Sequence, residues 1–152
     1  MKVNTFVQPN AYVIFTSNNE EYAIAAHKII DIKVASSGIS TLSARHRKKD
    51  VKTYHLLDFN VNISHKRTAI TEDTRILILN VNINGANVPA GIIIERIVDI
   101  MVIEDWQIGT PIIGKNKSDI TRNIAVNKDR KIQIIDPLKL LVSYEKLEST
   151  LY

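Results

Sequence analysis

The sequence has no cysteine and little glycine or aromatic content: five glycines and 6% aromatics in 152 residues. Without cysteine, disulfides, thiolate metal sites and cysteine nucleophiles are excluded, which fits a reducing compartment. No stretch approaches the roughly 20 apolar residues that span a bilayer. The N-terminal "MKVNTFVQPNAYVIF" lacks the apolar region and cleavage site of a secretory signal. We therefore expect a soluble cytoplasmic protein with no membrane insertion.

Motifs of enzymes and of cofactor sites are also missing from the sequence. GxSxG, GxGxxG and the phosphate-binding P-loop pattern do not occur. The four histidines show neither HxxxH nor HExxH spacing; they are His27, His46, His55 and His65. We therefore predict no catalytic activity, no cofactor and no metal site.

What the sequence does contain is enough apolar residues for a core. It is 45% hydrophobic and 24% charged, and its length suits one domain or two very small ones. Abundant Ile and Val favour strands over helices. The net charge of +4 permits a nucleic acid or an acidic protein partner and establishes neither.

Short strands separated by turn signals recur along the chain. Asn18-Asn19 and Asn84-Gly85 can take the positive φ of tight hairpin turns. Pro89 indicates an edge position or a bulge in its strand. Strands are predicted at residues 11–16, 21–25, 27–34, 51–59, 75–83 and 88–94, with a polar connection at 60–74 and a further hairpin that turns at 127–130.

One helix is predicted at "DPLKLLVSYEKL", where Asp136 can cap the N-terminus and Pro137 takes the first helical position. Many short strands with one terminal helix favour a mainly β fold of small barrels over a βαβ fold. The polar connection at 60–74 can mark the passage from one barrel to another.

The stretch "AGIIIERIVDIM" raises the question of a buried acid. Gly91–Ile94 is typical of a strand buried on both faces, Glu95-Arg96 interrupts it, and an apolar segment resumes at Ile97. Glu95 and Asp99 lie four residues apart, so on a strand Ile97 would separate them on the same face, and no other motif converges on them. The residues therefore disfavour a catalytic acid here, and a polar corner between two strands is the alternative.

The basic run "RHRKK", residues 45–49, has three interpretations: a solvated loop, a protein-binding edge or a nucleic-acid patch. No aromatic residue interleaves this run, although aromatics usually stack bases in nucleic-acid-binding barrels. Nucleic acid is therefore disfavoured as a partner. Trp106 is interpreted as a packing plug over a barrel end rather than as a ligand platform.

Four motifs in order resemble the CheW family of chemotaxis scaffold proteins. They are "YVIFTSNNEEYAIAAHKIIDI" (Tyr12–Ile32), "HLLDF" (His55–Phe59), "AGIIIERIVDIM" and "RKIQIIDPLKLL" (Arg130–Leu141). The resemblance implies two small five-stranded SH3-like barrels packed together, with a C-terminal helix. It implies one CheW-like domain over 1–152, with one subdomain of 1–15 and 64–135 and another of 20–63. It also implies that Glu95 is a polar corner between two strands and Asp99 a second polar break.

The function that the resemblance implies is a non-enzymatic adaptor. It would couple the cytoplasmic tips of chemoreceptors to the regulatory domain of the histidine kinase CheA, in the cytoplasm and recruited to receptor arrays at the membrane. The receptor-facing residues implied are Ile29, Asp31, Lys48, Lys49 and Arg75. The kinase-facing residues implied are Gly91, Ile97 and Ile100. For the apolar members of both sets, packing in the core is the alternative.

The chain departs from the family before its "HLLDF" strand. CheW proteins usually carry a Gly-Val-x-Asn-Leu-Arg-Gly stretch there, whereas this chain has "TLSARHRKKDVKTY". Lys48 and Lys49 can supply the charge, but not the bidentate fork of an arginine. Two alternatives therefore stay open: a CheW-like domain without receptor coupling, acting as a spacer or competing adaptor, and a basic nucleic-acid-binding barrel.

Overall fold

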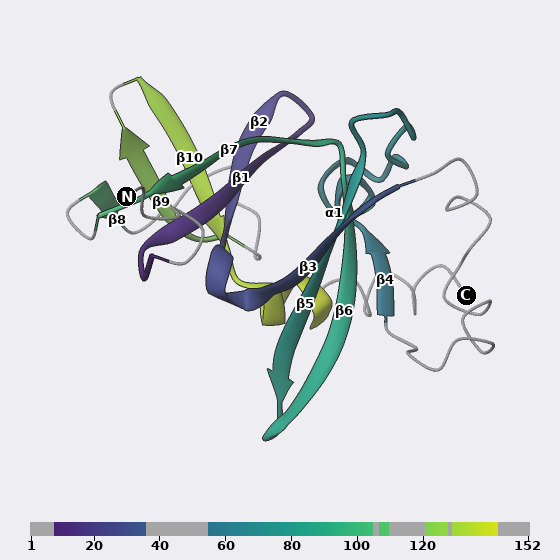
Figure 1. Ribbon diagram of the computed structural model, residues 1–152. Helices are drawn as coiled ribbons and strands as arrows, with labels where there is room; N and C mark the ends of the chain where they lie inside the picture. The colour runs from purple at the N-terminus through teal and green to yellow at the C-terminus, as the bar shows by residue number, and fades with distance from the viewer. Residues whose placement is uncertain (1–7, 36–54, 105–106, 110–120, 128, 143–152) are drawn as a thin grey trace, which may run out of the picture.

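The computed structural model describes residues 8–35, 55–104, 107–109, 121–127 and 129–142 (Figure 1). The strands are β1 (Ala11–Ser17), β2 (Glu20–Ala25), β3 (Ile29–Val34), β4 (His55–Asp58), β5 (Arg75–Ile83), β6 (Ala86–Ile94), β7 (Arg96–Val102), β8 (Ile108–Gly109), β9 (Thr121–Asn127) and β10 (Arg130–Ile135). A 3-10 turn, η2 (Ala26–Lys28), precedes β3, and helix α1 (Phe59–Ser64) follows β4. A further helix occupies 137–142. No helix of the described residues is long and apolar enough to cross a membrane.

The strands form two sheets. One has six strands in the order β7-β1-β2-β10-β9-β8, and the other has four in the order β3-β5-β6-β4. The predicted mainly β class, with two packed strand units and a C-terminal helix, is confirmed. Strands β1 and β2 pair within one sheet, although the resemblance implied different subdomains for 1–15 and 20–63. The domain boundaries themselves stay a prediction.

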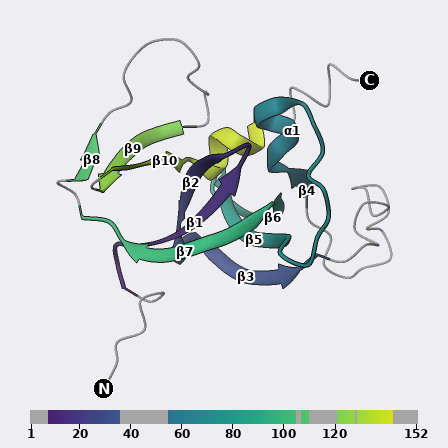
Figure 2. The ribbon, with the colours of Figure 1, turned by 90° about the horizontal axis from the view of Figure 1, so that it is seen from above.

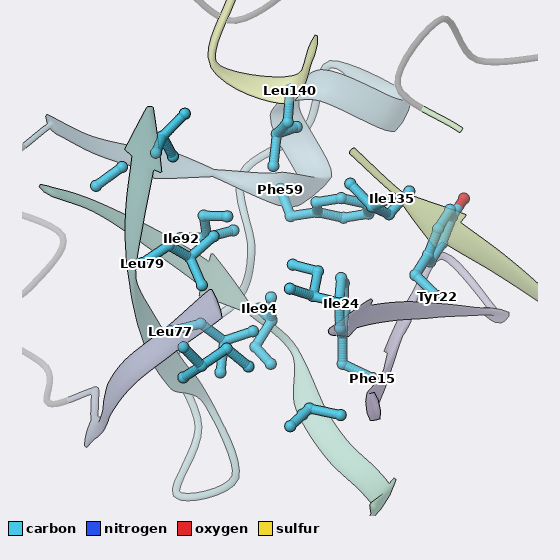
Figure 3. Close-up of a cluster of buried hydrophobic side chains, with 14 of the residues drawn as sticks. Phe15, Tyr22, Ile24, Phe59, Leu77, Leu79, Ile92, Ile94, Ile135 and Leu140 are labelled. Carbon is cyan, nitrogen blue, oxygen red and sulfur yellow. The ribbon is translucent and has the colours of Figure 1, made fainter. Parts of the chain in front are cut away.

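Three apolar clusters explain why so many strands are apolar on both faces. The largest, the shared cluster, lies between the two sheets and includes Phe15, Ile24, Leu77 and Ile92 (Figure 3). Neighbouring residues on the same strands point to the opposite faces because strand side chains alternate. Those residues form a separate cluster on each sheet: Ile14, Ala23, Ile132 and Ile134 on the six-stranded sheet, and Ile76, Ile78 and Ile93 on the four-stranded sheet.

Aromatic packing anchors the shared cluster. The ring of Phe59 lies edge-on to those of Phe15 and Tyr22, with centroid distances of 4.9 and 4.8 Å. Phe59 begins helix α1, so the predictions of a strand through residue 59 and of a polar connection from residue 60 are wrong at this point. The helix forms because Asp58 caps it, accepting a bond from the Asn60 N–H at 3.0 Å, while burial of Phe59 supplies the packing energy.

The predicted C-terminal helix begins where the capping signal placed it. The Asp136 side chain accepts a hydrogen bond from the Leu138 N–H at 3.0 Å. Leu140 and Leu141 are buried in the shared cluster together with Phe59, and Figure 2 shows this helix close to α1. Trp106 and the part of the predicted helix beyond residue 142 lie outside the described residues.

Both asparagine-containing turns form as predicted. Asn18 and Asn19 join β1 to β2 with φ of 53° and 67°. Asn84 and Gly85 join β5 to β6 with φ of 53° and 87°. Positive φ at both central residues is the hallmark of the two-residue turn that suits the twist of a β-hairpin. The hairpin predicted at residues 127–130 is also present, between the antiparallel strands β9 and β10.

Pro89 lies on an open stretch of β6. Strand β4 pairs with β6 only from Ala90 onward, so Pro89 has β5 on one side and no described strand on the other. Counting outward from the two-residue turn, Ile83 and Ala86 form a hydrogen-bonded pair, and Asn80 and Pro89 form a non-hydrogen-bonded one. The nitrogen of Pro89 therefore faces away from β5. On that outer side no described strand pairs with Pro89, so the missing N–H costs no hydrogen bond between strands.

Candidate protein-binding surfaces

Glu95 lies at the bend where the chain leaves the four-stranded sheet and enters the six-stranded one. Strand β6 ends at Ile94 and β7 begins at Arg96. The Glu95 Oε2 atom accepts hydrogen bonds from the Asn60 side chain at 2.7 Å and from the Asn18 N–H at 3.1 Å. It thus joins α1 to the β1–β2 turn. The interpretation of Glu95 as a polar corner agrees with these contacts.

Buried polar groups extend this junction. Ser17 is fully buried and donates a hydrogen bond to Asn60, whose own exposure is 9%. Asp58 accepts bonds from the Thr68 hydroxyl at 2.6 Å and from the Thr68 N–H at 2.8 Å. Buried polar groups are costly unless they are paired, so these bonds fix the junction between the sheets.

Asp99 belongs to a different network. It lies within the continuous strand β7, so the prediction of a second polar break there is wrong. Its Oδ2 accepts a bond from Arg130 Nη1 at 3.2 Å, and Arg130 also contacts both carboxylate oxygens of Glu21, at 2.9 and 3.1 Å. The hydrogen bonds to Glu21 and then to Asp99 raise the pKa of Arg130 above its ordinary value. Glu95 and Asp99 therefore do not form an acid–base pair.

The kinase-facing residues implied by the resemblance occupy three different environments. Gly91 is buried in the middle of the four-stranded sheet, between Ile78 of β5 and Leu56 of β4. Ile97 on β7 is half-buried against the shared cluster. Ile100, also on β7, keeps 38% of its surface exposed. Gly91 is thus on a different sheet from the other two, and only Ile100 presents a substantial surface.

Strand β7 is the edge of its sheet, and it carries a bulge. Asp99 pairs with Ile14 while Ile97 pairs with Phe15, so Val98 is the extra residue. Val98 is 37% exposed and lies two residues from Ile100. A bulge re-aims side chains at a sheet edge. Together, Val98 and Ile100 form an exposed apolar pair on β7, of which the sequence reasoning identified only Ile100.

The receptor-facing residues that lie in the described part of the chain meet on strands β3 and β5. Ile29 is a core residue with 6% exposure. Asp31 is exposed and pairs with Lys33 at 3.5 Å. Arg75 is half-buried and donates to the backbone carbonyls of Glu72 and Thr74 at 2.7 and 3.0 Å. Lys48 and Lys49 lie outside the described residues.

Strand β3 also exposes two apolar side chains that the sequence reasoning missed. Ile30 is 55% exposed and Val34 is 67% exposed, and β3 is an edge strand of its sheet. The sequence carried a signal for this exposure. In "IIDIKV" both faces of the strand carry apolar residues, and at the edge of a sheet some of them remain exposed. This apolar pair, with Asp31 between its members, defines a second exposed edge.

Comparison with known proteins identifies the family. A family model described as CheW-like domain matches residues 11–145, and the chain belongs to this family. Among solved structures, the chain is similar to the scaffolding protein TtCheW from Thermoanaerobacter tengcongensis, with a TM-score of 0.63 and 20% identity over 85% of this chain and 90% of that chain. At that identity the likeness establishes the fold. Comparison with curated proteins gives no match.

Family membership settles the class of the protein. The chain is a CheW-like domain over residues 11–145. Among the exposed large apolar side chains of the described residues, four lie on two edge strands, β3 and β7. Within the described residues, no group of three or more His, Asp or Glu side chains is placed to hold a metal ion.

Proposed function

We propose that this chain is a non-enzymatic adaptor that couples chemoreceptors to the regulatory domain of the histidine kinase CheA. The observation that carries the proposal is the family match over residues 11–145. We further propose that residues 1–152 act as one CheW-like domain, in the cytoplasm and at receptor arrays. The two exposed edges support an adaptor, since two partners need two separate surfaces.

The kinase contact is assigned to the apolar edge of β7. Val98 and Ile100 are exposed at 37% and 38%, and an apolar contact of this kind depends only weakly on salt. Exposed apolar side chains become binding determinants when a partner covers them. Ile97 contributes by supporting the strand from the core side. Gly91 serves to pack the neighbouring sheet, so it supports this surface only indirectly.

The receptor contact is assigned to the edge of β3. Asp31 and Arg75 stand on paired strands, and Ile30 and Val34 add exposed apolar area. The Arg75 guanidinium already bonds two backbone carbonyls, so it shapes the surface more than it offers free donors. The basic run at Lys48 and Lys49 is proposed to supply the charge that the family's missing arginine would provide.

Titration calorimetry with the isolated CheA regulatory domain tests the kinase assignment. Ile100→Glu should weaken binding at least tenfold, because a desolvated charge at an apolar contact costs well over the 1.4 kcal/mol of a tenfold change. The matched control is Val126→Glu on β9, which is 49% exposed on the same sheet and is separated from β7 by three strands in the sheet order. It should bind like the wild type.

Each other result of this titration has a definite meaning. Equal weakening by both variants would indicate a general loss of structure, which circular dichroism would reveal. Unchanged affinity of the Ile100→Glu variant would show that the kinase contact does not lie on β7. No binding by the wild type, combined with retention of nucleic acid on the same protein, would favour the basic nucleic-acid-binding barrel instead.

A further inference from the structure

The turn that joins β5 to β6 holds the only Asn-Gly pair of the sequence, Asn84-Gly85. Both residues are exposed, and a β-carbon added to Gly85 would meet no other atom within 4 Å. Because glycine has no side chain, it leaves the peptide nitrogen that follows Asn84 uncovered. The turn thus places an accessible side-chain amide beside an accessible backbone nitrogen.

These two groups can react with each other, and asparagine is among the thermolabile residues for this reason. The Gly85 nitrogen, after losing its proton to hydroxide, attacks the Cγ atom of Asn84 and forms a new C–N bond. The side-chain nitrogen takes up a proton from water and leaves as ammonia, so a five-membered succinimide remains. Water then opens the ring at one of its two carbonyl carbons, which gives aspartate or isoaspartate at position 84. Water is the only other reactant.

The folded turn opposes this reaction in two ways. Ring closure requires rotation about the Cα–C bond of Asn84, which the hairpin turn holds in another conformation, with φ of 53°. In addition, the Gly85 N–H donates a hydrogen bond to the Asn82 Oδ1 atom at 3.1 Å. A hydrogen bond to one protonation state favours that state, so this bond stabilises the protonated, unreactive nitrogen. Asn82 therefore holds the nucleophile in its unreactive form.

The end of this hairpin can open while the rest of the sheet stays intact. Strand β3 pairs with β5 as far as Leu79, and β4 pairs with β6 from Ala90 onward. Among the described strands, residues 80–89 therefore pair only with one another, and Figure 1 shows the hairpin end reaching past the rest of its sheet. Val81 is buried in the shared cluster, so opening involves the residues beyond it. Local opening costs less free energy than global unfolding, so the folded protein reaches the reactive conformation.

We propose that Asn84 is a site of spontaneous deamidation and that the Asn82 side chain sets the rate by holding the Gly85 N–H. The reaction brings a negative charge to a hairpin that carries none, since residues 76–94 contain no Asp, Glu, Lys, Arg or His. The isoaspartate product also adds one backbone carbon to the two-residue turn, which then no longer matches the twist of the strands. The inference does not depend on the adaptor function, because neither proposed partner surface includes this turn.

Peptide mapping by mass spectrometry tests the site, with the full chain incubated for several weeks at mildly alkaline pH. Asn84 should convert in the folded protein, and several-fold faster in concentrated guanidinium chloride, where the turn does not persist. Enzymatic methylation then distinguishes isoaspartate from aspartate. Asn18 is the internal control, because it occupies a turn of the same kind but is followed by Asn19, whose side chain hinders the attack. Asn18 should convert several-fold more slowly than Asn84 in both conditions.

Variants at two positions test the role of Asn82. Asn82→Ala removes the acceptor and should accelerate conversion in the folded chain about three- to tenfold, the range that loss of one hydrogen bond permits. Asn82→Asp keeps an oxygen acceptor and strengthens the bond by its charge, so it should react no faster than the wild type. Asn87→Ala, opposite Asn82 in the register, is the matched control and should stay within about twofold of the wild type. In guanidinium chloride all four proteins should react at similar rates.

A folded wild type that shows no conversion at Asn84, while the denatured chain converts, would overturn the proposal. So would equal rates at Asn84 and Asn18, because the Asn-Gly pair would then not direct the reaction. Equal rates for the folded wild type and Asn82→Ala would show that Asn82 does not set the rate, as would equal acceleration by Asn82→Ala and Asn82→Asp. Circular dichroism checks that each variant keeps its fold, which the exposure of both substituted positions favours.

Discussion

Asp99 on β7 accepts a hydrogen bond from Arg130 on β10 at 3.2 Å, although β1 and β2 lie between these two strands in the sheet order. In a flat sheet, strands three places apart are about 14 Å from one another. The contact therefore shows that the six-stranded sheet is strongly curled. Arg130 binds Glu21 at the same time, so one guanidinium joins three strands across the concave side.

Removal of the Arg130 guanidinium should destabilise the curled six-stranded sheet. We expect Arg130→Leu to lower the free energy of unfolding by about 1 kcal/mol, because the group is about one third exposed and surface ion pairs contribute little. Arg130→Lys keeps the charge but loses the two-pronged contact with Glu21, and should fall in between. Urea unfolding of the three proteins measures this. Equal stability of all three would show that the network contributes nothing.

The Glu95 junction should be more sensitive. Glu95→Ala leaves the Asn60 amide without its 2.7 Å acceptor at the junction of the sheets, and unsatisfied polar groups of this kind cost about 1–3 kcal/mol. Glu95→Gln retains one carbonyl acceptor and should lose less. Thermal and urea unfolding compare the two. A Glu95→Ala variant as stable as the wild type would show that Glu95 does not hold α1 and the β1–β2 turn together.

Tyr22 gives a prediction about alkaline pH. Burial, and then the neighbouring Glu20 carboxylate, raise the pKa of Tyr22 above its ordinary value of 10.0. As pH rises through the ordinary value, the unfolded chain loses this proton while the folded chain keeps it. The free energy of unfolding should therefore fall above pH 10, by at most about 1.4 kcal/mol per pH unit from this group.

The comparison with Tyr22→Phe isolates that contribution. The variant cannot ionise at this position, so its stability should fall less steeply above pH 10. Urea unfolding at several pH values between about 9 and 11 measures both slopes. Parallel slopes for the two proteins would contradict the raised pKa.

The basic run at residues 45–49 is predicted to make receptor binding electrostatic. Changing both Lys48 and Lys49 to Glu should slow association with a receptor cytoplasmic fragment several-fold at low salt. The effect should shrink above about 0.15 M salt, where the Debye length is roughly 8 Å. Surface plasmon resonance at several salt concentrations provides the rates, with the CheA domain as the control partner. Unchanged association at low salt would make this run a solvated loop.

The local features of the fold were predictable because short-range chemistry determines them. Asn84-Gly85 specified its turn, Asp136 its cap, and the unbroken apolar run Gly91–Ile94 a strand buried on both faces. Each of these signals involves neighbouring residues only. The polar corner at Glu95 was also predictable, since an acid between two apolar strands needs water or partners.

The tertiary partners were not predictable, because they lie far apart in the sequence. Glu95 bonds Asn60 and Asn18, which are 35 and 77 positions away. The short helix at Phe59–Ser64 escaped prediction for the same reason: its asparagines and serine are typical of a polar connection, and burial of Phe59 against Phe15 stabilises the helix instead. Exposure of the apolar side chains on β3 and β7 likewise depends on which strands lie at the edges of the two sheets.

Simultaneous binding of both partners tests the adaptor role most directly. A CheA regulatory domain and a receptor cytoplasmic fragment are mixed with and without this chain, and the mixtures are examined by analytical ultracentrifugation. The adaptor role predicts a complex containing all three proteins that is lost when Ile100→Glu replaces the wild type and kept with Val126→Glu. Binding of the two partners in mutually exclusive complexes, or of neither, would contradict it.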